Sequence, residues 1–278
     1  MIKPIKHFGQ NFLINKKAAE DIIEAAEIKE RDVVLEIGPG EGFLTEELLK
    51  RAGKVIAVEK DRRLAEVLKE KFAKEIKNGQ LELVLGDILE NPPHPSLVRE
   101  GNFSPPDKGE LEGVGYKIVA NIPYYITSPI LRKFLSDQSA SRQPRLMVLM
   151  VQKEVAQRII AKDKKESLLS LSVKAYGKAE IIRIVPKGNF RPMPKVDSAV
   201  IKISKISKDF FKDIGEVAFF GLVKKGFSHK RKMLMSNLKA SKTVFEQCDM
   251  SPKARAEEVS LEQWKCLTQC QGLTLTLG

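Results

Sequence analysis

The sequence predicts an α/β fold, in which a doubly wound, mostly parallel Rossmann-like sheet is followed by a small all-helical domain. Short buried strands alternate with amphipathic helices between residues 32 and 161, as is typical of a parallel sheet covered on both faces. A glycine-rich turn directly follows the first of these strands. Beyond residue 205 the apolar residues recur only at helical spacing. We therefore expect two domains, residues 1–205 and residues 206–278.

The expected elements of the first domain follow one another in a regular order. A helix with apolar residues at Ala18 and Ile22 begins after Asn15, which can serve as its N-cap. Further strands and helices are expected over residues 32–38, 42–52, 54–61, 61–76, 81–87, 116–121, 128–136, 145–152 and 153–161. Two strands close in sequence, 179–186 and 198–204, are expected to pair antiparallel at the sheet edge.

The second domain is expected to be helical throughout. Its apolar residues recur at helical spacing over residues 210–227, 230–240, 251–260 and 261–270.

One segment of the first domain breaks this pattern. Residues 91–115 hold five prolines and four glycines, with few large apolar side chains. Loops of this length are uncommon unless they are functional or disordered. We expect a flexible insertion, and a lid over the neighbouring site is the alternative.

The composition excludes several classes of protein. No apolar run approaches the roughly 20 residues of a membrane helix, and the N-terminus lacks the features of a signal peptide, so we expect a cytoplasmic protein with no membrane partner. The odd count of three cysteines (Cys248, Cys266 and Cys270), with the last two one helical turn apart, suggests reduced thiols in a cytosolic helix. The three histidines are scattered, so no metal site is expected.

Basic residues are in excess and gather in two stretches. Lysine and arginine number 48 against 36 acidic residues, which gives a net charge of +12. Residues 217–245 hold seven basic residues and no acid, and residues 181–196 hold four and no acid. Such clusters attract polyanions. A solvated lysine-rich face would explain the total charge equally well, but the clustering favours nucleic acid. The expected RNA contacts are Lys224, Lys225, Lys230, Arg231 and Lys232.

The glycine-rich turn is the first sign of a cofactor. Its three glycines, Gly38, Gly40 and Gly42, are spaced G-x-G-x-G, whereas the dinucleotide fingerprint is G-x-G-x-x-G. Glu36 and Glu41 flank the turn and would repel a pyrophosphate. They would suit a ligand with an ammonium or sulfonium centre, which favours S-adenosylmethionine over NAD. A structural turn without a ligand is the competing interpretation.

Acidic residues end the next two expected strands. Glu59 stands where an acid can accept hydrogen bonds from both ribose hydroxyls, and Asp87 could accept one from an adenine amine. Either acid alone would be read as a helix cap or a solvated turn residue, as we read Asp61. Glycines, Glu and Asp at three successive strand ends together indicate a nucleoside ligand in the crevice of an open sheet.

The fourth strand ends in a turn suited to methylation of a base amine. The lone pair of an exocyclic amine is delocalised into the ring, so acceptors on its two hydrogens favour a pyramidal and more nucleophilic nitrogen. Asn121 offers its side-chain oxygen, and Ile122 offers a backbone carbonyl whose direction Pro123 restricts. Tyr124 can stack on the base, worth ~1–3 kcal/mol. The alternative is a packing turn with no catalytic role.

Eight short motifs resemble the ribosomal RNA adenine N6-dimethyltransferase family, most closely its bacterial small-subunit branch. They are FGQNFL (8–13), EIGPGEGFLT (36–45), VEKD (58–61), GDIL (86–89), NIPYYITSPI (121–130), QKEVAQRI (152–159), FRPMPKVDSAV (190–200) and FSHKRKMLMSNL (227–238). The resemblance extends to residues 255–264 and so covers nearly the whole chain.

The resemblance implies a methyltransferase that uses S-adenosyl-L-methionine and no metal, built on a Rossmann-like methyltransferase sheet. Its product would be two N6,N6-dimethyladenosines in a hairpin near the 3′ end of small-subunit (16S) ribosomal RNA. The implied partner is the pre-30S ribosomal particle during subunit biogenesis, and we expect a monomer.

The resemblance also implies roles for single residues. Gly38 and Gly40 would hold the methionine part of the cofactor, and Asn121 would bridge cofactor and target. Phe190 would stack on the base opposite Tyr124. The implied cofactor-binding residues are Gln10, Asn11, Leu13, Glu36, Gly38, Gly40, Glu59, Lys60, Asp87, Ile88 and Asn121.

Two segments depart from the family, the insertion at 91–115 and the tail 271–278.

Three other functions are alternatives to the one that the resemblance implies. A resistance-type large-subunit rRNA adenine methyltransferase shares the cofactor motifs, but residues 190–200 and 227–238 favour the small-subunit enzyme. A non-catalytic RNA-binding assembly factor is disfavoured by the complete turn at 121–124, and an NAD-dependent oxidoreductase by the glycine spacing and Glu36.

Overall fold

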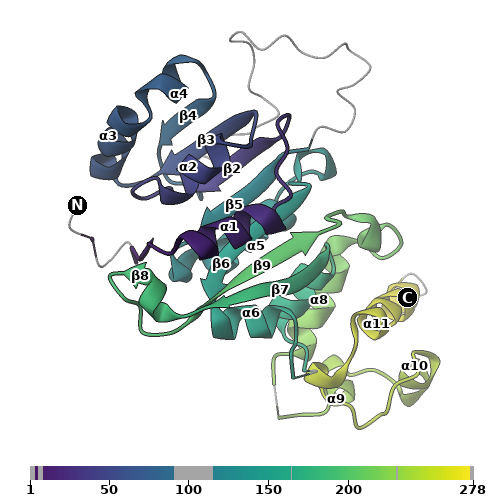
Figure 1. The fold of residues 1–278 in the computed structure, drawn as a ribbon. Helices are drawn as coiled ribbons and strands as arrows, with labels where there is room; N and C mark the ends of the chain where they lie inside the picture. Colours follow the sequence, from purple (N-terminus) through teal and green to yellow (C-terminus); the bar gives the residue numbers. More distant parts are fainter. Residues whose placement is uncertain (1–3, 6–8, 91–114, 164, 230, 276–278) are drawn as a thin grey trace. The chain divides into compact units, whose positions relative to one another are not determined.

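The computed structural model describes residues 4–5, 9–90, 115–163, 165–229 and 231–275 (Figure 1). Nearly all of the expected insertion, the last residues of the tail and Lys230 lie outside the described residues. The chain divides into two compact units, 1–156 with 178–206 and 157–177 with 207–278. A single boundary near residue 205 was expected from the sequence. Residues 157–177, which that boundary placed in the first domain, group instead with the second unit.

A seven-stranded sheet forms the first unit and confirms the predicted fold class. Its order is β4-β3-β2-β5-β6-β9-β7. The strands are β2 (Val33–Ile37), β3 (Lys54–Glu59), β4 (Leu81–Leu85), β5 (Lys117–Asn121), β6 (Leu146–Gln152), β7 (Lys178–Val185) and β9 (Ser198–Ser204). The first five in that order run parallel, and β9 pairs antiparallel with both β6 and β7, as expected for the sheet edge.

The strand order also predicts where a ligand binds. The chain runs outward from β2 through β3 to β4, and then returns to β5 on the other side of β2. This reversal is a topological switch point, and open α/β sheets bind ligands at such a point, outside the carboxyl ends of their strands.

Helices flank the sheet, and their ends follow local signals. They are α1 (Lys16–Ala25), α2 (Phe43–Leu49), α3 (Arg62–Lys71), α4 (Ala73–Lys77), α5 (Thr127–Leu135) and α6 (Lys153–Ile159). Asn15 caps α1 by accepting from the backbone N–H of Ala18 at 2.8 Å, and Asp61 caps α3 by accepting from that of Arg63 at 3.1 Å, so both predicted caps are confirmed. The single helix expected over 61–76 is two helices, because Phe72 leaves the helical backbone region.

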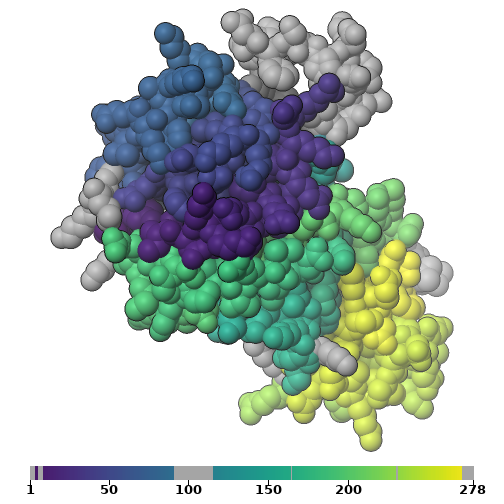
Figure 2. Space-filling view, viewed as in Figure 1, coloured from purple at the N-terminus to yellow at the C-terminus, as the bar shows by residue number. Residues whose placement is uncertain are grey.

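A two-stranded ribbon holds the N-terminal segment in place. Strand β1 (Phe12–Leu13) pairs antiparallel with β8 (Phe190–Arg191), so residues far apart in sequence lie side by side (Figure 2). Asn189 extends the contact: its backbone oxygen accepts from the N–H of Ile14 at 3.0 Å. The sequence pattern did not predict this ribbon.

The core of the first unit forms around the central strands. Val34, Val55, Val119 and Val148 are fully buried within one apolar cluster. At the opposite end of β5 from its turn, the ammonium of Lys117 forms an ion pair with Asp32 at 2.7 Å. Both side chains of this pair are buried. The apolar runs of the parallel strands therefore reflect burial on both faces of the sheet.

The second unit is helical, with its own core. Its helices are α7 (Leu168–Lys174), α8 (Glu216–Gly226), α9 (Leu234–Leu238), α10 (Lys242–Gln247) and α11 (Leu261–Leu275). Trp264, Phe219 and Phe245 are its largest fully buried side chains. Gly226 lies so close to Trp264 that a Cβ there would come within 2.3 Å of the indole ring. No helix among the described residues has both the length and the apolar character of a membrane span.

Two expected helices of this unit differ from the structure. The helix expected from residue 210 begins only at Glu216, after Gly215 with φ of 72°. The helix expected over 251–260 is wrong, because only Ala256–Glu258 forms a single 3₁₀ turn. Backbone groups of this segment bond to distant residues: Ala254 accepts from the N–H of Leu234 at 2.8 Å, and Glu257 from that of Glu166 at 2.7 Å.

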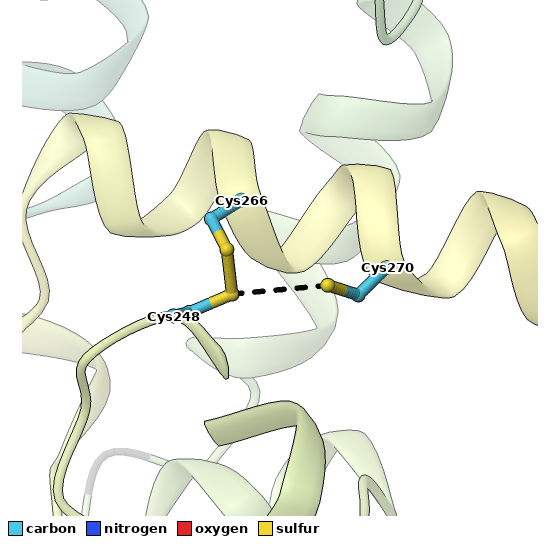
Figure 3. Close-up of side chains that lie close together, drawn as sticks. All are labelled: Cys248, Cys266 and Cys270. Atoms are coloured by element: carbon cyan, nitrogen blue, oxygen red, sulfur yellow. Dashed lines mark hydrogen bonds between the residues drawn. A yellow bond between two sulfur atoms is a disulfide. The ribbon is translucent and has the colours of Figure 1, made fainter. Parts of the chain in front are cut away.

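The cysteines are the clearest correction to the sequence prediction. Cys248 and Cys266 form a disulfide with a Cα–Cα distance of 5.7 Å (Figure 3), so reduced thiols were the wrong expectation for this pair. The two residues are 18 apart in sequence, and they meet because the end of α10 packs against α11. The spacing of the cysteines alone does not reveal that contact.

Candidate functional site

A cavity of about 370 Å³ opens at the carboxyl ends of β2, β3, β4 and β5. This is the topological switch point of the sheet. It is lined by segments 9–14, 36–41, 43–44, 58–60, 86–89 and 121–126, and by Leu64 and Lys71 of α3. Every cofactor-binding residue expected from the sequence lies on its wall, as do Ile122, Pro123 and Tyr124. The structure therefore brings together residues that the sequence spreads over more than a hundred positions.

Gly40 lets the backbone of the first turn pass close to the N-terminal segment. Its φ is +61°, a left-handed conformation that side chains disfavour. A Cβ at this position would lie 2.9 Å from the ring of Phe12. The backbone N–H of Gly40 donates to Glu59 Oε2 at 3.1 Å, so the turn is fixed from both sides.

Glu59 ties two turns together at the cavity wall. Its Oε1 accepts from the backbone N–H of Asp61 at 2.8 Å, while its Oε2 accepts from Gly40. Burial raises the pKa of the Glu59 carboxyl above its ordinary value, although these backbone donors act against the rise. Each carboxylate oxygen keeps a further lone pair, which a ligand hydroxyl could use.

Glu36 is the most perturbed group in the cavity. It is 1% exposed, and its Oε2 has no hydrogen-bond partner among the described residues. Burial, with the nearby charge of Glu59, raises the pKa of Glu36 to about 8. Thr45 acts against this rise. A buried carboxylate oxygen without a partner is nevertheless costly unless something compensates it. A cationic ligand group would do so, and the residues present therefore fit S-adenosylmethionine, which carries both an ammonium and a sulfonium.

Asp87 and Lys60 form a polar pair at the ends of β4 and β3. Lys60 Nζ lies 2.7 Å from Asp87 Oδ2, and Asp87 Oδ1 accepts from the backbone N–H of Leu89 at 2.9 Å. Partial burial acts to raise the pKa of Asp87, but Lys60 and Leu89 outweigh it and hold that pKa below its ordinary value. The carboxylate therefore stays ionised and available as an acceptor.

The N-terminal segment is anchored over the cavity by polar contacts. Gln10 Nε2 donates to Asp61 Oδ2 at 3.0 Å, and its Oε1 accepts from the backbone N–H of Ile5 at 2.7 Å. Asn11 contributes its backbone oxygen, which accepts from Asn121 Nδ2 at 3.1 Å. The segment thus contacts both the cofactor side of the cavity and the turn after β5.

The Asn11–Asn121 hydrogen bond fixes the orientation of the Asn121 amide. With the Nδ2 group engaged, the Oδ1 atom is left as an acceptor, and it receives no hydrogen bond from the described residues. The backbone oxygen of Ile122 likewise receives none from them. Two acceptors of adjacent residues are therefore available at one rim of the cavity, as a primary amine with two hydrogens requires.

Tyr124 and Tyr125 complete this rim in different ways. The Tyr124 hydroxyl is hydrogen-bonded to Ser198 Oγ at 2.7 Å, and burial raises the pKa of Tyr124. Tyr125 is 57% exposed, and its ring packs over Gly9, where a Cβ would approach within 3.2 Å. Both tyrosines line the cavity, and Tyr125 is a cavity residue to which the sequence motifs assign no role.

Other cavity residues were also overlooked, and their signals are weak. Phe12 and Phe43 lie in apolar runs that read equally well as core, and both line the cavity. Ser198, at the start of β9, does not line the cavity; it is fully buried and bonds to the Tyr124 hydroxyl, a contact that only the fold reveals. Phe190, by contrast, was expected at the site but does not lie there. It is 3% exposed within the apolar core and does not line the cavity, so its ring has almost no surface for a base.

The expected RNA-contacting residues lie in the second unit. Lys224 and Lys225 are exposed in the last turn of α8, and Arg231 and Lys232 are exposed just before α9. None of these four forms an ion pair with a residue that the structure describes. Their charges are therefore not neutralised by those residues and can meet a polyanion.

The family model and the relative that match this chain both describe enzymes that methylate ribosomal RNA. A model of the ribosomal RNA adenine dimethylase family matches residues 2–270. A Dehalococcoides mccartyi protein described as ribosomal RNA small subunit methyltransferase A is 43% identical over 274 residues, covering 96% of this chain and 88% of the relative.

Two solved structures are similar to the chain in fold and, to a lesser degree, in sequence. A dimethyladenosine transferase from Plasmodium falciparum is 28% identical with a TM-score of 0.73, and the match covers 92% of this chain and 95% of that one. The 23S rRNA methyltransferase ErmE is 26% identical with a TM-score of 0.71, covering 93% and 98%.

Proposed function

Because the chain belongs to the ribosomal RNA adenine dimethylase family, we propose that it dimethylates two adjacent adenosines of small-subunit ribosomal RNA at N6. Its methyl donor is S-adenosylmethionine, as in the methyltransferases of this family. The observation that supports the proposed chemistry most strongly is the pair of acceptors at Asn121 and Ile122, of which the Asn121 amide is oriented through Asn11.

The proposed mechanism rests on positioning rather than on a strong base. S-adenosylmethionine, when bound, supplies a methyl group activated by its sulfonium centre. Asn121 Oδ1 and the Ile122 carbonyl accept the two hydrogens of the adenine amine and so direct its lone pair away from the ring. Tyr124, braced by Ser198, stacks on the base, which must leave its helical stack to react. Alignment of the reacting atoms supplies the main rate advantage.

The second methylation requires a change at the same rim. After the first transfer the methylated nitrogen is cationic and releases one proton to solvent. It then carries one hydrogen, so Asn121 and Ile122 can no longer both accept from it. The monomethylated amine must rotate, and the rim must hold its methyl group in place of the lost hydrogen. We propose that this rotation takes place within the cavity of about 370 Å³, which both Asn121 and Ile122 line.

The proposed partner is the pre-30S ribosomal particle, with the protein acting as a monomer in the cytoplasm. The exposed residues Lys224, Lys225, Arg231 and Lys232 would bind the phosphates of the RNA around its hairpin.

Two other functions are less well supported. A large-subunit target is named for ErmE, so the shared fold does not by itself choose between subunits. The small-subunit relative, however, is 43% identical against 26% for ErmE. A non-catalytic RNA-binding assembly factor would have no need of the unpartnered Glu36 Oε2 or of the two acceptors at the same cavity.

Methyl transfer to each ribosomal subunit, offered separately, tests the proposal. Subunits would come from cells that lack the modification, and the methyl group of S-adenosylmethionine would carry the label. We expect label in the small subunit alone. Label found only in large-subunit RNA would support the resistance-type function, and RNA binding without transfer would support the assembly factor.

A further inference from the structure

Three cysteine sulfurs meet in the second unit, where the proposed methylation uses none of them. Cys266 and Cys270 project from one face of α11 towards Cys248, which follows the last residue of α10 (Figure 3). Cys270 Sγ lies 3.9 Å from Cys248 Sγ, and all three sulfurs lie within 4.8 Å of one another. A disulfide needs two cysteines, so the third sulfur calls for an explanation of its own.

The distance between the sulfurs of Cys248 and Cys270 matches a metal site, and reduction of the Cys248–Cys266 bond would let the third sulfur join them. Zinc binds thiolates at about 2.3 Å in a tetrahedron, which places ligand sulfurs about 3.8 Å apart. The observed 3.9 Å between Cys248 and Cys270 agrees with this value. Because Cys266 and Cys270 are four residues apart in a helix, their side chains share one face without any change of backbone. The Cα–Cα distance of 5.7 Å between Cys248 and Cys266 also allows both thiolates to reach one ion.

The surroundings can complete such a site. Cys248 is 5% exposed, while Cys266 and Cys270 are half-buried, so an ion could enter from solvent. Gln247 offers two oxygens nearby: its backbone oxygen is 4.0 Å from Cys266 Sγ, and its Oε1 is 3.8 Å from Cys270 Sγ. Either Gln247 Oε1 or a water molecule could supply the fourth ligand.

We propose that Cys248, Cys266 and Cys270 form a three-thiolate zinc site when the disulfide is reduced. A dithiol reductant opens the Cys248–Cys266 bond to two thiols and is itself oxidised to a disulfide. Binding of Zn²⁺ by the three sulfurs then releases three protons to solvent. The ion would join the end of α10 to two successive turns of α11, whereas the disulfide joins it to one. The site goes beyond the proposed function, because it binds neither the methyl donor nor RNA.

Cobalt substitution tests the site in the full-length protein. Co²⁺ bound by thiolates in a tetrahedron gives intense sulfur-to-cobalt charge-transfer absorption, which Zn²⁺ abolishes by displacement. After reduction with a phosphine and its removal under nitrogen, we expect this absorption to saturate at one cobalt per chain. The oxidised protein should give none. Absence of the absorption from the reduced protein would overturn the proposal.

Two variants assign the ligands. Cys270→Ser keeps the disulfide pair, and we expect it to lose most of the absorption and to bind Zn²⁺ at least about 10-fold more weakly. Gln269→Ala changes an exposed neighbour on α11 and should behave as the wild type does. Full absorption by Cys270→Ser would show that the site does not need the third sulfur, and would overturn the proposal.

Alkylation of the wild-type protein gives a second measurement that does not depend on how a variant folds. In the reduced protein, Zn²⁺ should slow iodoacetamide modification of all three cysteines together, and a chelator should restore it. Peptide mass spectrometry reads each cysteine separately. Protection of only two of the three, or of none, would contradict a three-thiolate site.

Discussion

Asn121 is the residue on which the proposed chemistry depends most. Its side chain is oriented by a backbone oxygen 110 positions away, that of Asn11. This contact explains why the motif around residue 121 and the segment around residue 11 belong to one site. An amide whose Nδ2 group is held leaves only its oxygen to face a substrate amine.

Replacing Asn121 by alanine should remove transfer while leaving the fold intact. The side chain is at the rim of the cavity rather than in the apolar core, so we expect an unchanged circular dichroism spectrum. The rate of methyl transfer should fall at least about 100-fold, as it does when a positioned polar group is removed from a transition state, and the cofactor should bind less tightly. Asn78→Ala, at an exposed turn, is the matched control. Wild-type turnover by Asn121→Ala would refute the assigned role.

Glu36 should make cofactor affinity depend on pH. The pKa of Glu36 is about 8 in the ligand-free protein, so below that pH its carboxyl must release a proton before it can pair with a cationic ligand. We expect the affinity for S-adenosylmethionine to rise as pH increases to about 8 and then to level off. Calorimetric titrations across this range would measure the rise.

Glu36→Gln supplies the comparison for that titration, with Glu70→Gln, an exposed acid of α3, as control. The Gln variant should bind more weakly at pH 8 and lose the pH dependence assigned to this group. The stability of the ligand-free protein should change with pH in the opposite direction to its affinity for the cofactor. A carboxyl pKa raised from 4.5 to about 8 makes the wild type less stable as pH rises through that interval. An unchanged affinity profile in Glu36→Gln would contradict this account.

Among the elements, the turn between β2 and α2 has a backbone that limits substitution next to the cavity. Gly40→Ala would place a Cβ 2.9 Å from the Phe12 ring at a φ of +61°. We expect a decrease of about 1–2 kcal/mol in the free energy of unfolding from the backbone conformation alone, together with weaker cofactor binding. Gly188→Ala is the matched control, because a Cβ there meets nothing within 4 Å. Equal stabilities of the two variants in urea unfolding would show that the turn is not constrained as described.

Strands and helices whose apolar residues follow a regular pattern were predictable from the sequence, and elements without such a pattern were not. The parallel strands and the turn residues at their ends followed from apolar runs punctuated by Gly, Glu, Asp and Asn, because the sheet brings its carboxyl ends together. Strands β1 and β8 have two residues each, too few to show alternation. Residues 251–260 carry a helical pattern, but bonds from Leu234 and Glu166 fix their backbone otherwise. Contacts of this kind depend on the tertiary fold.

The same reasoning applies to the candidate site. Residues that end a strand were predictable, since their polar character interrupts an apolar run. The assigned stacking role of Phe190 came from a motif, whereas packing places its side chain in the core. Ser198 and Tyr125 carry no sequence signal that separates them from packing residues. The contact of Ser198 with Tyr124 follows from the pairing of β9, and the place of Tyr125 at the cavity follows from the approach of Gly9.

At the scale of the whole molecule, the charge distribution should govern RNA binding. Replacing Lys224, Lys225, Arg231 and Lys232 by alanine removes four exposed positive charges from the second unit. We expect weaker binding of small-subunit RNA and a shallower dependence on salt, by roughly 0.7–0.9 in log–log slope for each phosphate that the variant no longer neutralises. Replacing the exposed lysines Lys69, Lys74 and Lys77 of the first unit should have a much smaller effect. Equal effects of the two sets would place the RNA surface elsewhere.

The most direct test of the central claim is to map the methylated nucleosides made by the wild-type protein. Small subunits that lack the modification would be incubated with S-adenosylmethionine, and the RNA would be digested and analysed by mass spectrometry. We predict two adjacent N6,N6-dimethyladenosines in one hairpin near the 3′ end of the small-subunit RNA, and none when Asn121→Ala replaces the wild type. Methyl groups at another position of the RNA, or only in large-subunit RNA, would contradict the account.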